Sequence, residues 1–283
     1  MSKLMSTKSI SLAACIVIAV LSVLVAIVVG GGNRRTSPHS QGQPAVEEAA
    51  ETAQALDGQS NEAPAVPPDV RDEVKRVVDS QESYAERNAA LIKIWYELNE
   101  SEVGALEKCI IDEACCARTE LHALKNDIMN VLRRRSGDPD GVVIFLCDGA
   151  DVFLERGDNV MVDYCIQHAA AALEGNISSE ARGQVMEMLR NATGYPDRTW
   201  SATALLSLDR APNATWRDNA FVERQTMMLL KESNLDAVRV SCIDVAKRNR
   251  WRSVAPVLQE LQNKRGLSIA MKSAIANALD VLR

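Results

Sequence analysis

The chain has 283 residues, of which 47% are hydrophobic and 25% charged, so its composition is that of an ordinary globular protein with one or two domains. Only 4% of the residues are aromatic, and neither alternating apolar runs nor a series of Gly/Asn hairpin turns is present, which argues against a β-sandwich. The formal net charge of −6 makes non-specific nucleic-acid binding unexpected.

The first 29 residues have the pattern of a membrane anchor. Residues 1–8 are short and basic, and residues 9–29 carry no charge and are almost wholly apolar. Roughly 20 apolar residues are needed to span a bilayer as a helix, whereas the apolar core of a cleaved signal peptide is typically about 7–15 residues. The sequence therefore predicts an uncleaved transmembrane helix over residues 9–29, with a cleaved signal peptide as the alternative.

The flanking charges predict the topology only in part. Lys3 and Lys8 precede the apolar run, and Arg34 and Arg35 follow it, so the positive-inside rule is nearly balanced. The short basic segment resembles the first region of an export signal, and long domains are translocated largely regardless of charge. We therefore expect the N-terminus in the cytoplasm and the rest of the chain on the extracytoplasmic (periplasmic) side, with its cysteines buried as thiols.

Residues 30–68 read as a disordered linker. They are rich in Gly, Ser, Pro, Gln and Ala and include acidic residues such as Glu47, Glu48 and Glu62. Such a segment has too little apolar surface to offset the entropy lost on ordering. We expect it to hold the folded part of the chain away from the membrane.

Residues 69–283 show helical spacing of apolar residues throughout. The run Val142–Leu154 is continuously apolar at its start and fits a strand as well, but we predict a buried helix because no neighbouring segment offers a sheet partner. The helices expected before the last 50 residues are Val70–Val78, Tyr84–Leu98, Ser101–Ile110, Glu120–Arg135, Val142–Leu154, Val160–Leu173, Ser179–Leu189, Trp200–Leu208 and Trp216–Leu230.

The stretch from Leu235 to Leu282 predicts three short helices joined by tight turns. Its first apolar stripe ends at Asn249 and Arg250, and the second helix starts near Trp251 with Pro256 in its first turn, where a missing N–H costs little. Gly266 marks the end of that helix, and Ser268 is the expected N-cap of the last one. In that last helix Ala270 and Ala274 are expected beside the inward-facing stripe.

This stretch resembles a HEAT repeat. The likeness lies in VRVSCIDVAKRNR followed by the SVAPVL that opens the second helix, and in the small-residue helix SIAMKSAIANALDVL that would start the next unit. It covers about one and a half units well and the rest of residues 69–283 in outline. The resemblance implies an all-α fold, an α-solenoid of helical pairs, whose concave helix face usually binds other macromolecules; it carries over no catalytic residue.

Cysteine and histidine offer two weak candidates for chemistry. The densest cluster, Cys109, Cys115, Cys116 and His122, has no CxxC pair and so lacks the spacing of a recognised zinc site. Cys165 and His168, three apart, share a helix face, but no third partner of a nucleophile–base arrangement is evident. Together with Asp127 they are the least improbable polar residues of an enzyme. We expect packing to explain them, with no metal, cofactor or catalytic residue.

Three further residue types invite functional readings. Arg133, Arg134 and Arg135 end a helix, where cations interact favourably with the dipole; an anionic partner is the alternative. We expect the four Asn-x-Ser/Thr triplets to be helix caps, with glycan acceptors as the alternative. We expect the four tryptophans to lie in the core or between helices, with a platform for base stacking as the alternative. The triplets begin at Asn99, Asn176, Asn191 and Asn213, and the tryptophans are Trp95, Trp200, Trp216 and Trp251.

The sequence as a whole predicts a single-pass membrane protein whose helical-repeat domain is a scaffold for a protein partner. It contains no phosphate-binding glycine loop, HExxH or nucleophile elbow, so neither catalysis nor a small-molecule substrate is expected. The alternatives are an enzyme or enzyme subunit with an unrecognised site, and a purely structural protein of the envelope.

Overall fold

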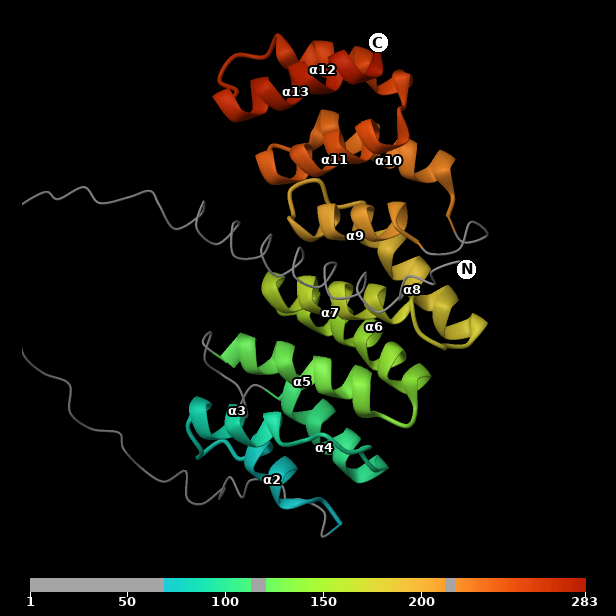
Figure 1. Ribbon diagram of the computed structural model, residues 1–283. Coiled ribbons are helices and arrows are strands. Elements are labelled where there is room, and N and C mark those ends of the chain that lie inside the picture. The colour runs from blue at the N-terminus through green and yellow to red at the C-terminus, as the bar shows by residue number, and fades with distance from the viewer. Residues whose placement is uncertain (1–68, 113–120, 212–216) are drawn as a thin grey trace, which may run out of the picture. The chain divides into compact units, whose positions relative to one another are not determined.

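The computed structural model describes residues 69–112, 121–211 and 217–283, all of which belong to one compact unit. Figure 1 traces the helices of this unit from α2, in blue-green, to α13, in red. The predicted span, residues 9–29, and the predicted linker, residues 30–68, lie outside the described residues. Within the described part no helix combines the length and the apolar character needed to cross a bilayer.

The described residues are all-α, as predicted: they form 12 α-helices and one short 3-10 helix, Arg252–Val254, with no strand among them. An isolated bridge between Leu98 and Ser136 is the β-type pairing recorded there. The helices are α2 Asp72–Val78, α3 Tyr84–Ile92, α4 Glu100–Ile111, α5 His122–Arg135, α6 Pro139–Glu155, α7 Asn159–Ala172, α8 Ser179–Ala192, α9 Trp200–Asp209, α10 Asn219–Glu232, α11 Asp236–Asn249, α12 Ala255–Gln262 and α13 Ile269–Leu282.

Side-chain caps fix the starts of most of these helices. Capping boxes open α3, through Ser83 and Glu86, and α4, through Asn99 and Glu102, so that two orphan donors are satisfied at each start. Asp or Ser side chains accept a hydrogen bond from the first turns of α6, α7, α8, α10 and α13. The predicted cap Ser268 is confirmed among them at the start of α13.

The helices pack in two interleaved sets. Each odd-numbered helix contacts the next odd-numbered one, from α3 through to α13, and we call this set the odd row. The even-numbered helices contact each other in the pairs α2 with α4, α6 with α8 and α10 with α12, and we call this set the even row. Most helices also contact a direct neighbour in the other row. Each short helix thus buries on its neighbours an apolar face that it could not bury alone.

The segment that fits both a strand and a helix is helical. Pro139 occupies the first turn of α6 and the Asp138 side chain accepts the N–H of Gly141 at 2.9 Å, so the helix starts three residues before the apolar run. Val142, Val143 and Leu146 are buried, and α6 contacts α7 and α8. Neighbouring helices, and not a sheet, therefore cover this apolar run.

A buried carboxylate joins three helices near the other end of the unit. Asp209, at the end of α9, has a side chain with no exposed surface, and it accepts hydrogen bonds from Arg217 at 2.9 Å and Asn249 at 2.7 Å and pairs with Arg248. Arg217 also donates to Asn249. Two guanidinium groups compensate the loss of hydration around one carboxylate, which makes this a cross-brace between α9, the start of α10 and α11.

The structure corrects several details of the sequence-based prediction. The helix that begins at Tyr84 ends at Ile92 and not at Leu98, and Trp95, expected in the core, is 74% exposed. Asn99, not Ser101, caps α4. Ala270 is exposed, whereas Ala274 is half-buried and packs against the core as expected. The α3 error has a physical cause: the run of β-branched and aromatic residues after Leu91 has weak helix propensity, and the capping box fixes a new start at Asn99.

Candidate functional site: a groove between α6 and α8

A groove of about 330 Å³ lies on the even row, between α6 and α8, with the start of α9 at one end. Its floor is apolar: Val162 and Ile166 of α7 are buried, and Trp200 of α9 is 1% exposed. Ile144, at 39% exposure, and Tyr195, at 40%, contribute large side chains that stay accessible. Accessible apolar and aromatic surface beside a buried floor is the composition of a site that binds another molecule.

Carboxylates form the rim of the groove. Asp148 and Asp151 are exposed on α6, three residues apart and therefore on one face, and Glu187 is exposed on α8 across from them. A cation, Arg198, lies 5.7 Å above the Trp200 ring, but it is paired with Asp197 at 3.7 Å. The groove therefore offers net negative charge around an apolar floor.

Cys147, which also lines the groove, is not a nucleophile at neutral pH. Burial raises the pKa of its thiol to about 12, and the neighbouring Asp148 and Asp151 carboxylates act in the same direction. Because a thiol reacts as its thiolate, the environment of Cys147 suits packing and not attack on a substrate.

The Cys165–His168 candidate is not arranged for catalysis. Burial raises the pKa of the Cys165 thiol, and burial followed by the charges of Arg133 and Arg134 lowers the pKa of His168 to about 4. The His168 Nε2 atom lies 3.0 Å from Asn126 Oδ1, so that ring nitrogen already has a partner. Both side chains lie in the interior of the helix packing.

Asp127, the third enzymatic candidate, is half-buried on α5. Burial raises the pKa of its carboxyl, and a hydrogen bond from Asn126 partly opposes that change. The pKa of Tyr164 on α7 is raised first by burial and then by the charges of Asp163 and Asp127, which places the three groups near one another on the odd row. They are separate from the groove between α6 and α8.

The densest Cys/His cluster of the sequence contributes no metal site to the described part of the chain. Cys109 is buried and receives a contact of 3.3 Å from Arg87, while His122 pairs with Asp158 at 3.1 Å. Cys115 and Cys116 lie outside the described residues. In the ranges that the structure describes, no three His, Cys, Asp or Glu side chains are grouped to hold a metal ion.

The remaining candidates from the sequence analysis that the structure describes lie mostly at helix ends, at helix caps or in the packing between helices. Arg133, Arg134 and Arg135 form the last turn of α5, as the dipole argument predicts. The triplets that begin at Asn99 and Asn176 contribute the N-caps Asn99 and Ser178, and the triplet at Asn191 contributes Thr193 at the C-cap of α8; Asn213 is not described. Trp200 is buried and Trp251 half-buried, as expected for packing residues, whereas Trp216 is not described.

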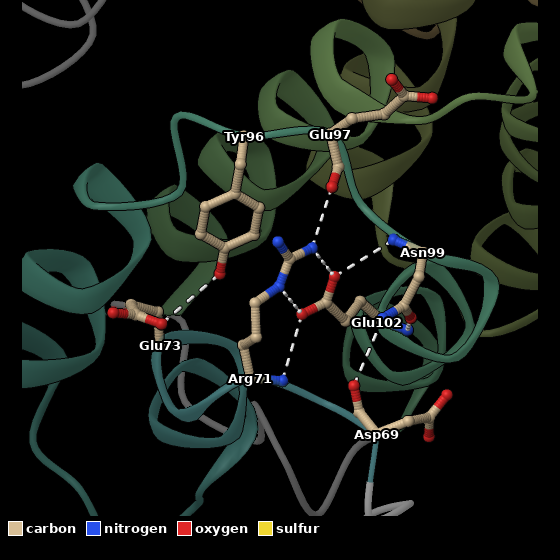
Figure 2. Close-up of polar contacts among 7 residues, drawn as sticks. All are labelled: Asp69, Arg71, Glu73, Tyr96, Glu97, Asn99 and Glu102. Carbon is tan, nitrogen blue, oxygen red and sulfur yellow. Dashed lines mark hydrogen bonds and ion pairs between the residues drawn. The ribbon is translucent and has the colours of Figure 1, made fainter.

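A second polar cluster lies where the described chain begins. Arg71 donates from Nε to Glu102 Oε1 at 2.6 Å and from Nη2 to the Glu97 carbonyl at 2.8 Å, and it forms an ion pair with Glu102. Its guanidinium lies 3.4 Å over the centre of the Tyr96 ring. Figure 2 shows Arg71 in the middle of these contacts, with Tyr96 and Glu73 on one side and Glu102 and Asn99 on the other.

Glu102 is the buried half of this cluster. Its side chain has no exposed surface, and burial acts to raise its pKa, but hydrogen bonds from Arg71 and Asn99 outweigh burial and lower it. The carboxylate is thus charged and fully engaged, so the cluster is a fixed structural brace between the start of α2 and the start of α4.

Sequence reasoning missed the groove. Its signal was present in part, because Asp148 and Asp151 interrupt an apolar run at a spacing that places them on one face of a helix. Glu187 lies on another helix far along the chain, and only the packing of α6 against α8 brings it to the same rim.

No family model matches this chain, and no curated protein or solved structure matches it.

Proposed function

We propose that the protein is a membrane-anchored helical-repeat scaffold that binds a protein partner in the groove between α6 and α8. The architecture would be an α-solenoid of HEAT-like pairs. The contacts of the odd row support that reading, because each of its helices packs against the next one, and the even row adds the pairs α2 with α4, α6 with α8 and α10 with α12.

The groove carries the proposal for binding. Its apolar floor favours aliphatic or aromatic side chains, and its three rim carboxylates favour Lys or Arg beside them. The partner segment we infer is therefore a short stretch with one or two large apolar residues flanked by cations. A purely structural spacer would not need the accessible side chains of Ile144 and Tyr195 in the groove, and the buried, protonated Cys165 and neutral His168 give the enzyme alternative no support.

Residues 9–29 anchor the scaffold in this proposal, and residues 30–68 let it reach partners near the membrane. The N-terminus lies in the cytoplasm and the helical domain on the extracytoplasmic side. The support is the uncharged apolar run and the short basic segment before it.

Peptide binding to the purified full-length protein tests the groove. We would compare a peptide in which Leu and Phe alternate with Lys against one in which Glu replaces each Lys. The Lys peptide should bind more tightly, and its affinity should fall as salt is added, because rim charges are screened. In the Asp148→Lys/Asp151→Lys variant its affinity should drop at least about tenfold, which corresponds to about 1.4 kcal/mol.

Glu232→Lys/Glu260→Lys is the matched control, because both residues are exposed carboxylates of the even row outside the groove. It changes the net charge in the same sense but should leave the affinity within about twofold, since a distant exposed charge contributes little. Equal binding of the two peptides, or equal weakening by the control, would refute the groove as the binding site. A pull-down from detergent-solubilised membranes with the same two variants then identifies the native partner.

A further inference from the structure

Two large apolar side chains project into solvent at the end of α3. Ile92 is 75% exposed and Trp95 is 74% exposed, while Leu91, Ile94 and Leu98 around them are buried. We call residues 92–95 the Trp95 tip. An exposed tryptophan next to an exposed isoleucine leaves apolar area in water, and burying that area against another surface would be favourable.

The Trp95 tip is held in this exposed position. Backbone hydrogen bonds turn the chain at Ile94 N to Leu91 O, 3.1 Å, and at Trp95 N to Lys93 O, 3.0 Å. Tyr96 packs edge-on against Trp95 with ring centroids 6.3 Å apart, and Tyr96 is itself stacked under the Arg71 guanidinium. The cation, its buried Glu102 partner and Tyr96 therefore support Trp95 from behind, so that the indole does not fold back onto the domain.

The Trp95 tip also lies close to the point where the first 68 residues join the domain. The Asn99 side chain donates to the Asp69 carbonyl at 3.2 Å, and Arg71 binds both Glu97 and Glu102, so the start of the described chain is fixed to the segment that follows the tip (Figure 2). In the function proposed above residues 30–68 are a linker, and a flexible chain of that length would have a root-mean-square span of roughly 30–40 Å. The proposed membrane anchor would therefore keep the Trp95 tip within a few tens of ångströms of the bilayer.

We infer that the Trp95 tip docks into the interfacial region of the lipid bilayer in which residues 9–29 are anchored; this rests on the membrane anchoring proposed above. Tryptophan prefers the headgroup level, where its ring is apolar and its N–H remains hydrated, and Ile92 adds apolar area beside it. Lys93 in the tip and the exposed Glu97 and Glu100 after it leave no net positive charge that would attract anionic lipid, so zwitterionic lipid suffices and salt has little effect. Tethering supplies an effective concentration in the millimolar range, so a weak contact becomes occupied.

Fluorescence quenching in reconstituted vesicles tests this docking. Full-length protein is reconstituted into phosphatidylcholine vesicles with or without brominated acyl chains, after flotation has shown that it is membrane-bound. The wild type should lose a larger fraction of its tryptophan emission to the brominated lipid than Trp95→Phe, because Trp95 is the indole at the interface. Ile92→Ser should reduce that excess at least twofold.

Ile269→Ser is the matched control, since Ile269 on α13 is 89% exposed and lies in a different part of the unit. It should leave the excess quenching unchanged, and 1 M salt should not abolish it. A floated protein whose wild-type and Trp95→Phe forms are quenched equally would overturn the docking and leave the anchor intact. A protein that does not float with the vesicles would overturn both the docking and the membrane anchor. A wild-type protein that forms a dimer but shows no excess quenching, and whose dimer is lost in Ile92→Ser, would assign the Trp95 tip to a contact with a second copy of the chain and overturn the membrane contact.

Discussion

His168 is a buried imidazole whose environment links stability to pH. Burial, and then the charges of Arg133 and Arg134, lower its pKa from 6.5 to about 4, while Asn126 occupies its Nε2 atom. Between these two values the unfolded chain binds a proton that the folded chain does not. Stability contributed by the neutral ring is therefore complete above pH 6.5 and is lost as pH falls towards 4.

The size of this effect can be measured with His168→Gln, which keeps a polar group near Asn126 but does not titrate. From pH 7 to pH 4 the wild type should lose about 3 kcal/mol more unfolding free energy than the variant. Urea denaturation at both pH values gives the two losses. Equal losses would show that His168 takes up its proton in the folded state near its ordinary pKa.

Single residues also show where sequence reasoning stops. The cap at Ser268 and the end of α11 at Asn249 and Arg250 were predicted, whereas the left-handed conformation of Arg250 was not. The exposure of Trp95 was not, because the apolar period of α3 continues past the point where its backbone leaves the helix. Asn99 and Glu102 had the spacing of a capping box and were the missed signal.

At the scale of one element, α13 tests the helical register. Ala274 is half-buried and packs against the core that α13 forms with α11 and α12. Ala274→Arg forces volume and an unpaired charge into that contact, so the melting temperature of the full-length protein should fall by at least about 4 °C, where ~1 kcal/mol corresponds to roughly 2–4 °C.

Ala270→Arg, one turn earlier on the same helix, is the control, because Ala270 is exposed. It should change the melting temperature by less than about 2 °C. A similar small change for Ala274→Arg would mean that the two positions share an exposed face and that the register of α13 is wrong.

Elements were predictable where periodicity and caps agreed, as they did for α7, α8 and α13. Helix α5 has no side-chain N-cap and was predicted from its apolar periodicity alone. They were ambiguous where an apolar run was buried on several sides, as at Val142–Leu154, because the helical pattern of such a run is no longer one-sided. Pro139 and Asp138 ahead of that run are helix-start signals, and they decide between the two readings.

For the whole molecule, membrane attachment and topology are the decisive measurements. The protein should sediment with membranes and remain there after carbonate extraction, because residues 9–29 are long enough to span the bilayer. A protease added to cells with a permeabilised outer layer should cut within residues 30–68. A linker that survives until the inner membrane is broken would reverse the orientation, and a soluble form beginning near Asn33 would identify a cleaved signal peptide.

Contacts between residues far apart in the chain lie beyond sequence reasoning. Arg71 and Glu102 are separated by 31 positions, and Asp209 and Asn249 by 40, and no local pattern pairs them. The groove has the same origin, because α6 contributes Asp148 while α8 contributes Glu187. The composition and periodicity predicted the class of fold, whereas the sites depend on how its helices are packed.

The alternation of the odd row and the even row has a consequence for how the chain reaches its native state. Among the helices α2 to α13 of the described residues, the extensive contacts join helices that are at most two apart along the sequence. The average loop that must close before two helices meet is therefore short, and the entropy lost in closing it is small. In the solenoid proposed above, folding would start at any pair of adjacent helices and spread in both directions, so a destabilising substitution in one pair would slow folding there and not in the rest of the unit.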